Sequence, residues 1–284
     1  MPLRIAIQKS GRLSEASLSL LRDCGIRIQR GKNALIAPAT NFDLEVLYLR
    51  DDDIPQYVAD GIADCGMLGQ NGVAEKAVEV TTDRKLGFAG CRLSLAVPKA
   101  VDYPGVAYFR GKKIATSYPV ILGEFLRKHK VDAEVHEISG SVEIAPNIGL
   151  ADGICDIVST GSTLFSNGLK EVERVMDSEA VLISQPGLSG AKRELLDRLL
   201  FRMAAVQQAQ DAKYIVMNVP TEKVAAVQEI LPGIKSPTVV PLADPGWKAV
   251  HSVVQEARFW EVIDQVRAAG AEGIVVLPIQ KMVV

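Results

Sequence analysis

Short apolar runs alternate with helical patterns along the first part of the chain. The apolar runs predict strands at residues 3–7, 44–49 and 64–68. Between them, apolar residues at helical spacing predict helices at residues 14–22 and 54–60. Helices between strands are typical of right-handed crossovers that join parallel strands, so this order predicts an α/β layered domain.

An internal repeat predicts two lobes of similar construction. Gly61-Ile62-Ala63-Asp64, with Gly69 after four further residues, matches Gly153-Ile154-Cys155-Asp156, with Gly161 after four further residues. Upstream of each copy, a basic residue opens a strand that ends in a polar loop, at residues 4–10 and 113–119. Two such lobes would direct their strand ends toward a shared cleft, where open α/β sheets usually bind ligands.

The rest of the chain changes in character. A strand at residues 92–98 is expected to cross between the lobes, and a long helix at residues 192–210 is expected to return the chain to the first lobe. The last seventy-odd residues predict strands at 214–219, 238–242, 247–254 and 273–278. They predict helices at 221–231, with Thr221 as N-cap, and at 258–269, stopped by Gly270. The order βαββαβ is typical of ferredoxin-like domains.

The chain therefore predicts an α/β protein with three parts, which suits its length of 284 residues. The first lobe would be discontinuous and comprise residues 1–95 and 181–210. The second lobe would comprise residues 96–180, and the βαββαβ domain residues 211–284.

Composition excludes several classes of protein. Apolar residues make up 48% and charged residues 23% of the chain, which is ordinary for a globular protein, and the net charge is −2. A mildly acidic chain is not expected to bind nucleic acid or a membrane surface. The chain starts in a strand pattern without a signal-peptide apolar stretch, and no apolar run approaches bilayer length. We therefore expect a cytoplasmic protein.

The cysteines do not predict a metal site or a disulfide framework. The four lie at Cys24, Cys65, Cys91 and Cys155, without a CxxC pair, and the three histidines do not cluster with them. We expect the cysteines to be small buried apolar residues and expect no firm metal site made by protein side chains alone.

The strongest candidate site follows a predicted strand at residues 154–158. In the loop at residues 159–163, a glycine allows close approach of an anion, and backbone amides and four hydroxyls supply donors. A following helix would direct its N-terminus at the same anion. Asp156 just before the loop is placed to accept hydrogen bonds from sugar hydroxyls, so the combination suits a ribose 5-phosphate group. A polar strand-to-helix turn capped by Asp156 is the alternative, and the pattern alone leaves both open.

The stretch from Glu143 to Leu164 resembles the phosphoribosyl-pyrophosphate-binding segment of the ATP phosphoribosyltransferase family, which opens histidine biosynthesis. Further segments that resemble this family lie at residues 8–14, 50–55, 90–94, 113–119, 236–238 and 241–243. The resemblance covers essentially the whole chain. It implies the long form of the family, with two lobes like those of type II periplasmic binding proteins and a C-terminal ferredoxin-like regulatory domain.

The resemblance implies transfer of a phosphoribosyl group from phosphoribosyl pyrophosphate to N1 of ATP, with release of pyrophosphate and with Mg²⁺ carried by the substrate. It requires no covalent nucleophile. The residues implied for phosphoribosyl pyrophosphate are Glu143, Asp156, Ser159, Thr160, Gly161, Ser162, Thr163 and Leu164. Those implied for ATP or pyrophosphate are Lys9, Gly11, Arg12, Arg50, Asp64, Gly66 and Leu68, with the last three as an adenine wall.

The cations have a plainer interpretation. Lys9 and Arg12 would then be solvated charges of a first helical turn, and Arg50 would pair with the acidic run at residues 51–53, as exposed charges commonly do.

The resemblance also implies histidine as a feedback inhibitor, bound through Asn218, Ser236 and Thr238. Some relatives carry an acid where this chain has Asn218, so the contact to the ammonium group of the ligand is open. A purely structural, dimer-forming domain is the alternative. The family assembles as homo-dimers and homo-hexamers, and its long form needs no separate regulatory subunit.

Two other classes of protein share features with this sequence. A solute-binding protein would share the fold, but the absence of a signal peptide and the phosphate-suited loop argue against it. An effector-binding transcription regulator is expected to carry a helix-turn-helix module before the first lobe, but no such module precedes it here and the charge is mildly acidic.

Overall fold

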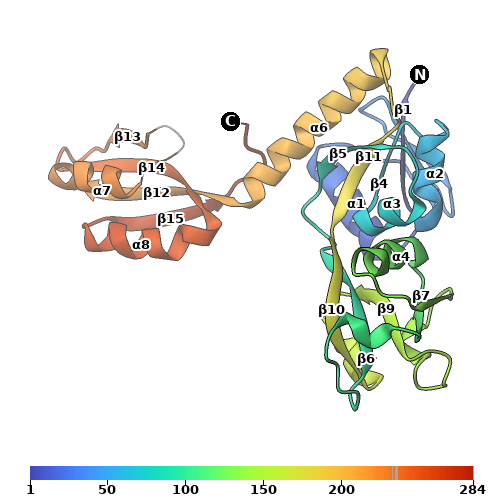
Figure 1. Cartoon of the computed structure of the whole chain (residues 1–284). Helices are drawn as coiled ribbons and strands as arrows, with labels where there is room; N and C mark the ends of the chain where they lie inside the picture. The colour runs from blue at the N-terminus through green and yellow to red at the C-terminus, as the bar shows by residue number, and fades with distance from the viewer. Residues whose placement is uncertain (232, 234–235, 284) are drawn as a thin grey trace. The chain divides into compact units, whose positions relative to one another are not determined.

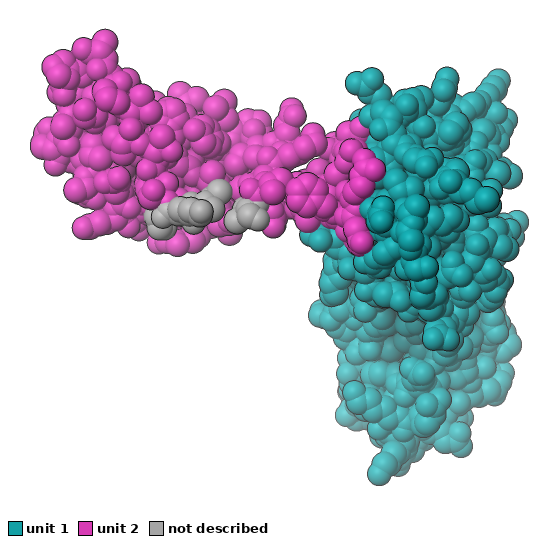
Figure 2. Space-filling model, turned by 90° about the horizontal axis from the view of Figure 1, so that it is seen from above, with its two compact units in different colours: residues 1–22, 26–196 teal, residues 23–25, 197–284 magenta. Residues whose placement is uncertain are grey.

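The computed structural model describes residues 1–231, 233 and 236–283 (Figure 1). The chain forms two compact units, one of residues 1–22 and 26–196 and the other of residues 23–25 and 197–284 (Figure 2). None of the described helices is long and apolar enough to cross a membrane.

The first unit contains two sheets, and the first has the strand order β2-β3-β1-β4-β11-β5. Its strands are β1 (Leu3–Gln8), β2 (Ile36–Pro38), β3 (Leu44–Leu49), β4 (Cys65–Gly69), β5 (Thr81–Lys85) and β11 (Ala180–Ser184). Its helices are α1 (Arg12–Asp23), α2 (Ile54–Ala59) and α3 (Gln70–Lys76). We call this sheet and these helices the first lobe.

The first lobe is parallel only at its centre. Strands β3, β1 and β4 run parallel, whereas β11 is antiparallel to both β4 and β5, and β2 is antiparallel to β3. The central strands are buried on both faces, as the near-continuous apolar run of β1 requires. The prediction of parallel strands therefore holds for the centre, and the antiparallel edges are an addition that short crossover patterns do not reveal.

The second sheet has the strand order β10-β6-β9-β7-β8. Its strands are β6 (Cys91–Pro98), β7 (Lys113–Thr116), β8 (Glu134–Glu137), β9 (Gly153–Val158) and β10 (Leu169–Ser178). The helices α4 (Pro119–Lys128) and α5 (Ser162–Ser166) accompany it, and we call this part the second lobe. Strand β7 runs parallel to β8 and β9, whereas β6 pairs antiparallel with β9 and β10.

The return of the chain to the first lobe differs from the prediction. Strand β11 makes that return by inserting between β4 and β5, before the long helix α6 (Gly190–Gln210) begins. The start of α6 is tied to the first lobe by ion pairs from Lys192 to Asp64 and from Arg193 to Asp83, at 2.8 and 3.2 Å. The helix crosses the boundary between the two units, which lies between residues 196 and 197.

The second unit confirms the predicted βαββαβ order. Its elements are β12 (Ala212–Pro220), α7 (Val224–Ile230), β13 (Thr238–Pro241), β14 (Trp247–Gln255), α8 (Phe259–Ala268) and β15 (Glu272–Pro278). They form an antiparallel sheet of order β13-β14-β12-β15, the ferredoxin-like arrangement. Alternate residues of β12, namely Ile215, Met217 and Val219, are buried in a core shared with α7 and α8, so the helices cover one face of the sheet.

Thr221 is not the N-cap that the sequence predicted. It opens a 3₁₀ turn at Thr221–Lys223, and its hydroxyl donates to the carbonyl of Pro245 at 3.1 Å. Helix α7 begins only at Val224, because this turn precedes it.

Candidate functional site

The predicted anion loop lies at the carboxyl end of β9. Gly161 is the N-cap of α5 and has φ = +80°, a left-handed conformation that favours glycine. Ser162 and Thr163 occupy the first turn of α5 rather than the loop itself, and the hydroxyls of Thr160 and Ser162 lie 3.0 Å apart. Thr160, Ser162 and Thr163 are exposed, so their donors are accessible to a ligand.

Leu164 differs from its neighbours in this segment. It is buried in a cluster with Ala96, Ala115 and Val158 beneath the helix. Leu164 therefore anchors α5 to the second sheet instead of presenting a side chain to a ligand.

Two carboxylates lie beside this loop. Asp156 is half-buried on β9, and its Oδ1 accepts a hydrogen bond from the backbone N–H of Ile157 at 2.8 Å. Burial raises the pKa of Asp156, the Ile157 hydrogen bond lowers it, and the charge of Glu143 raises it further. Glu143 lies in a 3₁₀ turn at Val142–Ile144 that contacts β9. The structure thus brings together both acids that the sequence assigned to the ribose.

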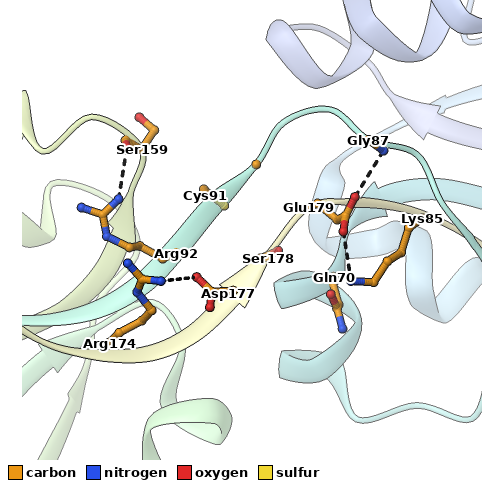
Figure 3. A pocket seen from close by; sticks show the side chains of 11 residues that line it. Gln70, Lys85, Gly87, Cys91, Arg92, Ser159, Arg174, Asp177, Ser178 and Glu179 are labelled. Atoms are coloured by element: carbon orange, nitrogen blue, oxygen red, sulfur yellow. Dashed lines mark hydrogen bonds and ion pairs between the residues drawn. The ribbon is translucent and has the colours of Figure 1, made fainter. Parts of the chain in front are cut away.

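A cavity of about 460 Å³ borders the loop at Ser159 (Figure 3). It lies where β6 and β10 connect the lobes, and Gln70 at the start of α3 also lines it. Arg92 on β6 donates to the carbonyl of Ser159 at 3.3 Å and forms an ion pair with Glu171 of β10. The carbonyl of Ser159 is therefore engaged by the protein, whereas its exposed side chain is available to a ligand.

The charges around this cavity are mostly paired. Lys85 pairs with Glu179 at 3.0 Å, and Arg174 pairs with Asp177 at 3.2 Å (Figure 3). Glu179 also accepts the backbone N–H of Gly87, which fixes the segment that leads from β5 into β6. This network braces the two connections between the lobes next to the anion loop.

The first lobe contributes a second polar edge. Lys9 follows β1 and Arg50 follows β3, and these strands are parallel neighbours with Gln8 opposite Leu49. The backbone N–H of Lys9 donates to the carbonyl of Leu49 at 2.8 Å, which closes the gap between the two strand ends. Both side chains are exposed. The structure therefore places these two cations at one edge of the sheet.

Gly11 and Arg12 belong to the same edge. Gly11 has φ = +95°, which allows the turn from β1 into α1, and Arg12 is the first residue of that helix. Arg12 is exposed, like Lys9 before it. A cluster of cations at the carboxyl ends of parallel strands suits the oxygens of a polyphosphate.

The three residues predicted as an adenine wall lie in the interior of the first lobe. Asp64 is 2% exposed, precedes β4 at the amino end of the strand, and binds the Lys192 ammonium and the backbone N–H of Arg4, each at 2.8 Å. A Cβ on Gly66 would lie 2.7 Å from Cγ2 of Ile54, so Gly66 permits α2 to approach β4. Leu68 is fully buried in the same core.

Tyr118 is a cleft residue that the sequence did not single out. It directly precedes α4, and burial raises its pKa, as do the charges of Asp156 in the second lobe and of Asp51 and Asp52 in the first. A hydrogen bond with Asn71 of α3 acts in the opposite direction. Tyr118 therefore lies where the two lobes meet, close to the acid expected to bind ribose. The available signal was the polar loop of the second repeat copy.

A contact between helices joins the lobes nearby. Glu75 on α3 accepts hydrogen bonds from the backbone N–H groups of Val120 and Ile121, at 2.9 and 3.0 Å. These amides lie in the first turn of α4, so a carboxylate of the first lobe caps a helix of the second. No local pattern predicts this contact, because the residues lie 45 positions apart in the sequence.

The residues expected to bind a regulatory amino acid lie in the second unit. Asn218 on β12 is opposite Ala249, and Thr238 on β13 is opposite His251, so both project from the face that α7 and α8 leave uncovered. Strand β14 separates them, and their partners on it are two residues apart, which sets their backbones about 12 Å apart. Ser236 is exposed just before β13.

Among the described residues, no group of three or more histidine, cysteine or acidic side chains is placed to hold a metal ion. Cys24, Cys65 and Cys155 are buried and Cys91 is half-buried, and all four are free thiols.

Two family models together match most of the chain. The family model described as "HisG: ATP phosphoribosyltransferase" matches residues 50–205, and "HisG, C-terminal domain" matches residues 209–281. An ATP phosphoribosyltransferase of Cytophaga hutchinsonii is 57% identical over 99% of this chain and 98% of its own length. One of Bacteroides thetaiotaomicron is 56% identical over 99% of this chain and its own full length.

Solved structures agree with the sequence comparisons. The ATP phosphoribosyl transferase (HisG:HisZ) complex of Thermotoga maritima contains a chain that is 28% identical, with a TM-score of 0.62, covering 71% of this chain and 98% of that one. A substrate-binding protein of an amino acid ABC transporter is 11% identical, with a TM-score of 0.50, covering 74% of this chain and 94% of that one. The latter likeness concerns the fold alone.

Proposed function

The chain belongs to the ATP phosphoribosyltransferase family, and we propose that it transfers the phosphoribosyl group of phosphoribosyl pyrophosphate to N1 of ATP. This reaction is the first step of histidine biosynthesis. We assign this reaction to the loop at the end of β9, where Gly161 is left-handed and Asp156 and Glu143 lie beside it.

The loop supports binding of the 5-phosphate. Thr160, Ser162 and Thr163 offer exposed hydroxyls, and Gly161 adds no side chain that would keep an anion from the backbone. We assign the phosphate to these four residues. Ser159 remains a candidate through its side chain.

The acids support binding of the ribose. Pyrophosphate leaves with the bonding electrons of C1, so C1 gains oxocarbenium character before N1 of adenine bonds to it. A carboxylate that accepts hydrogen bonds from the ribose hydroxyls also favours this positive charge. We assign this role to Asp156, supported by Glu143. The protein needs no covalent nucleophile, because holding the two partners in line supplies much of the rate enhancement.

The cations of the first lobe support binding of the leaving group. Lys9, Arg12 and Arg50 are exposed at one edge, and the two guanidinium groups suit bidentate contact with phosphate oxygens. Mg²⁺ would arrive with phosphoribosyl pyrophosphate, since this ion typically uses one or two protein carboxylates plus substrate phosphates. Asp156 and Glu143 fit that donor set. When bound, the ion would help to neutralise the departing pyrophosphate.

The test is an assay with ATP, phosphoribosyl pyrophosphate and Mg²⁺ that measures pyrophosphate and the adenine adduct. Asp156→Ala should lower turnover by about two orders of magnitude or more while the fold survives. Thr163→Val should raise KM for phosphoribosyl pyrophosphate far more than KM for ATP. Ser166→Ala is the matched control, since this hydroxyl lies at the far end of α5 and bonds the carbonyl of Ser162. Near-normal turnover of Asp156→Ala would remove that residue from the mechanism.

We further propose that the second unit binds histidine and that this inhibits the transferase. The support is the domain match at residues 209–281 and the polar positions Asn218, Ser236 and Thr238 near one open sheet face. Calorimetry with free histidine tests this, with Thr238→Val expected to weaken binding about tenfold. Thr221→Val is the control, because its hydroxyl is engaged with Pro245. Absence of heat and of inhibition would leave the domain structural.

We propose homo-dimers or homo-hexamers without a separate regulatory subunit, since the chain carries its own C-terminal domain. Light scattering together with activity of the purified chain tests both points. A monomer, or a chain inactive until a second protein is added, would contradict the proposal.

A further inference from the structure

A second cluster of cations surrounds a different cavity in the first lobe. This cavity has a volume of about 320 Å³, and none of its lining residues belongs to the site described above. Arg22 from the last turn of α1 and Arg27 and Arg30 from the segment after it lie around the opening. Leu18, Ile26, Ile28 and Tyr48 supply an apolar lining.

The guanidinium groups of this cavity have no carboxylate partner among the described residues. Arg27 makes hydrogen bonds through its backbone: its N–H donates to Oδ1 of Asn41 at 2.9 Å, and its carbonyl accepts from the N–H of Thr40 at 2.9 Å. Arg30 donates through Nε to the carbonyl of Ala34 at 3.3 Å, which leaves its two terminal nitrogens available. Three like charges around one opening repel one another, so an anion between them is electrostatically favoured.

Arg30 is also held in place by an aromatic ring. Its guanidinium carbon lies 3.6 Å from the centroid of the Tyr48 ring, which is close enough for a cation–π contact. The planar guanidinium fork of arginine matches an oxyanion bidentately, and the cation–π contact holds the Arg30 guanidinium at the cavity.

Tyr48 adds an independent observation. The residue is 2% exposed, and its hydroxyl oxygen is buried without a hydrogen-bond partner among the described residues. Buried polar groups in native proteins are nearly always hydrogen-bonded, so a ligand that accepts a hydrogen bond from this hydroxyl would be stabilised. A bound oxyanion would accept such a hydrogen bond.

We propose that this cavity binds a small phosphate-bearing molecule with a flat apolar part. The arginines recognise the phosphate, the Tyr48 hydroxyl donates to it, and the apolar part lies on Leu18 and Ile28. A volume of about 320 Å³ falls within the range of small-molecule sites and exceeds what inorganic phosphate alone would fill. The site is separate from the transferase cleft, so it does not depend on the proposed function.

Phenyl phosphate is the probe, because it combines a phosphate with one flat ring. Calorimetry on the full chain, with phosphoribosyl pyrophosphate saturating the cleft, should show binding of phenyl phosphate. Inorganic phosphate should bind at least fivefold more weakly under the same conditions. Arg27→Ala and Arg30→Ala should each weaken phenyl phosphate at least tenfold. Arg110→Ala is the matched control, an exposed arginine of the second lobe outside the cavities described here, and should change nothing.

Tyr48→Phe separates the hydroxyl from the ring. This variant keeps the surface on which Arg30 stacks, and it should weaken phenyl phosphate about fivefold while raising the melting temperature of the free protein. Unchanged affinity in all three cavity variants would overturn the proposal. So would a loss of binding in Thr163→Val that the arginine variants do not share, because the probe would then occupy the cleft.

Discussion

Gly161 and Gly168 flank the same short helix and offer a matched test of the anion loop. Gly161 has φ = +80° before α5, and Gly168 has φ = +72° after it. A Cβ on Gly161 would come no closer than 3.9 Å to Val158, and a Cβ on Gly168 would meet nothing within 4 Å. Neither substitution by alanine creates a clash, so backbone strain alone decides the cost.

The strain of a left-handed alanine is about 1–2 kcal/mol. Gly161→Ala and Gly168→Ala should therefore each lower the free energy of unfolding in urea by about 1 kcal/mol. Only Gly161→Ala should raise KM for phosphoribosyl pyrophosphate. Relief of its strain turns the backbone amides away from the phosphate, and a loss of about 1.4 kcal/mol corresponds to a tenfold effect. The ATP KM should stay within about twofold in both variants, because the two glycines flank α5 in the second lobe whereas the cations Lys9, Arg12 and Arg50 belong to the first lobe.

The reasoning would be refuted by a Gly161→Ala enzyme with an unchanged phosphoribosyl pyrophosphate KM despite the expected stability loss. It would equally be refuted if Gly168→Ala raised that KM to the same extent. The first result would show that the loop amides do not hold the phosphate, and the second that α5 responds to strain as a whole.

Three further predictions concern charges. Lys192→Met leaves the buried Asp64 carboxylate without its cation and should lower the free energy of unfolding by about 2 kcal/mol. This is less than the cost of breaking a fully buried ion pair, because the Lys192 side chain is 34% exposed. An unchanged urea midpoint would contradict the prediction. Glu75→Ala removes two charge-assisted hydrogen bonds to α4 and should cost about 1–2 kcal/mol in the same assay, whereas no loss would show that the contact is neutral. Burial raises the pKa of Asp156, so its ionised form destabilises the folded state. This destabilisation is absent below the ordinary aspartate pKa and grows as pH rises through the folded-state pKa. Asp156→Asn should therefore be more stable than the parent at pH 7 and equal to it near pH 3, yet nearly inactive; lower stability at pH 7 would refute this sign.

Local patterns were sufficient for the elements and for the loop. Strand β3 coincides with the predicted run at residues 44–49, because a short, nearly continuous apolar run is a local signal of a buried strand. The same holds for the βαββαβ order of the second unit and for the Gly161 turn, where residue type determines the backbone conformation.

Contacts between distant residues could not be predicted in this way. The repeat suggested that Asp64 and Asp156 are equivalent, yet Asp64 precedes its strand and meets Lys192, which lies 128 positions later. Glu75 and the amides of α4 likewise meet only because the two lobes pack together. Tyr118 was visible as part of a polar loop, but its approach to acids of both lobes arises from tertiary structure.

The insertion of β11 between β4 and β5 has a consequence for synthesis on the ribosome. Residues 91–178 form a contiguous second lobe that can fold as soon as it emerges. Strand β5, in contrast, lies at the edge of its sheet beside β11 and must wait about a hundred residues for that partner. Until residue 184 emerges, β4 presents an open, apolar edge of the kind that promotes aggregation. Nascent chains halted before residues 180–184 have emerged should therefore depend on chaperones far more than chains halted after they have emerged.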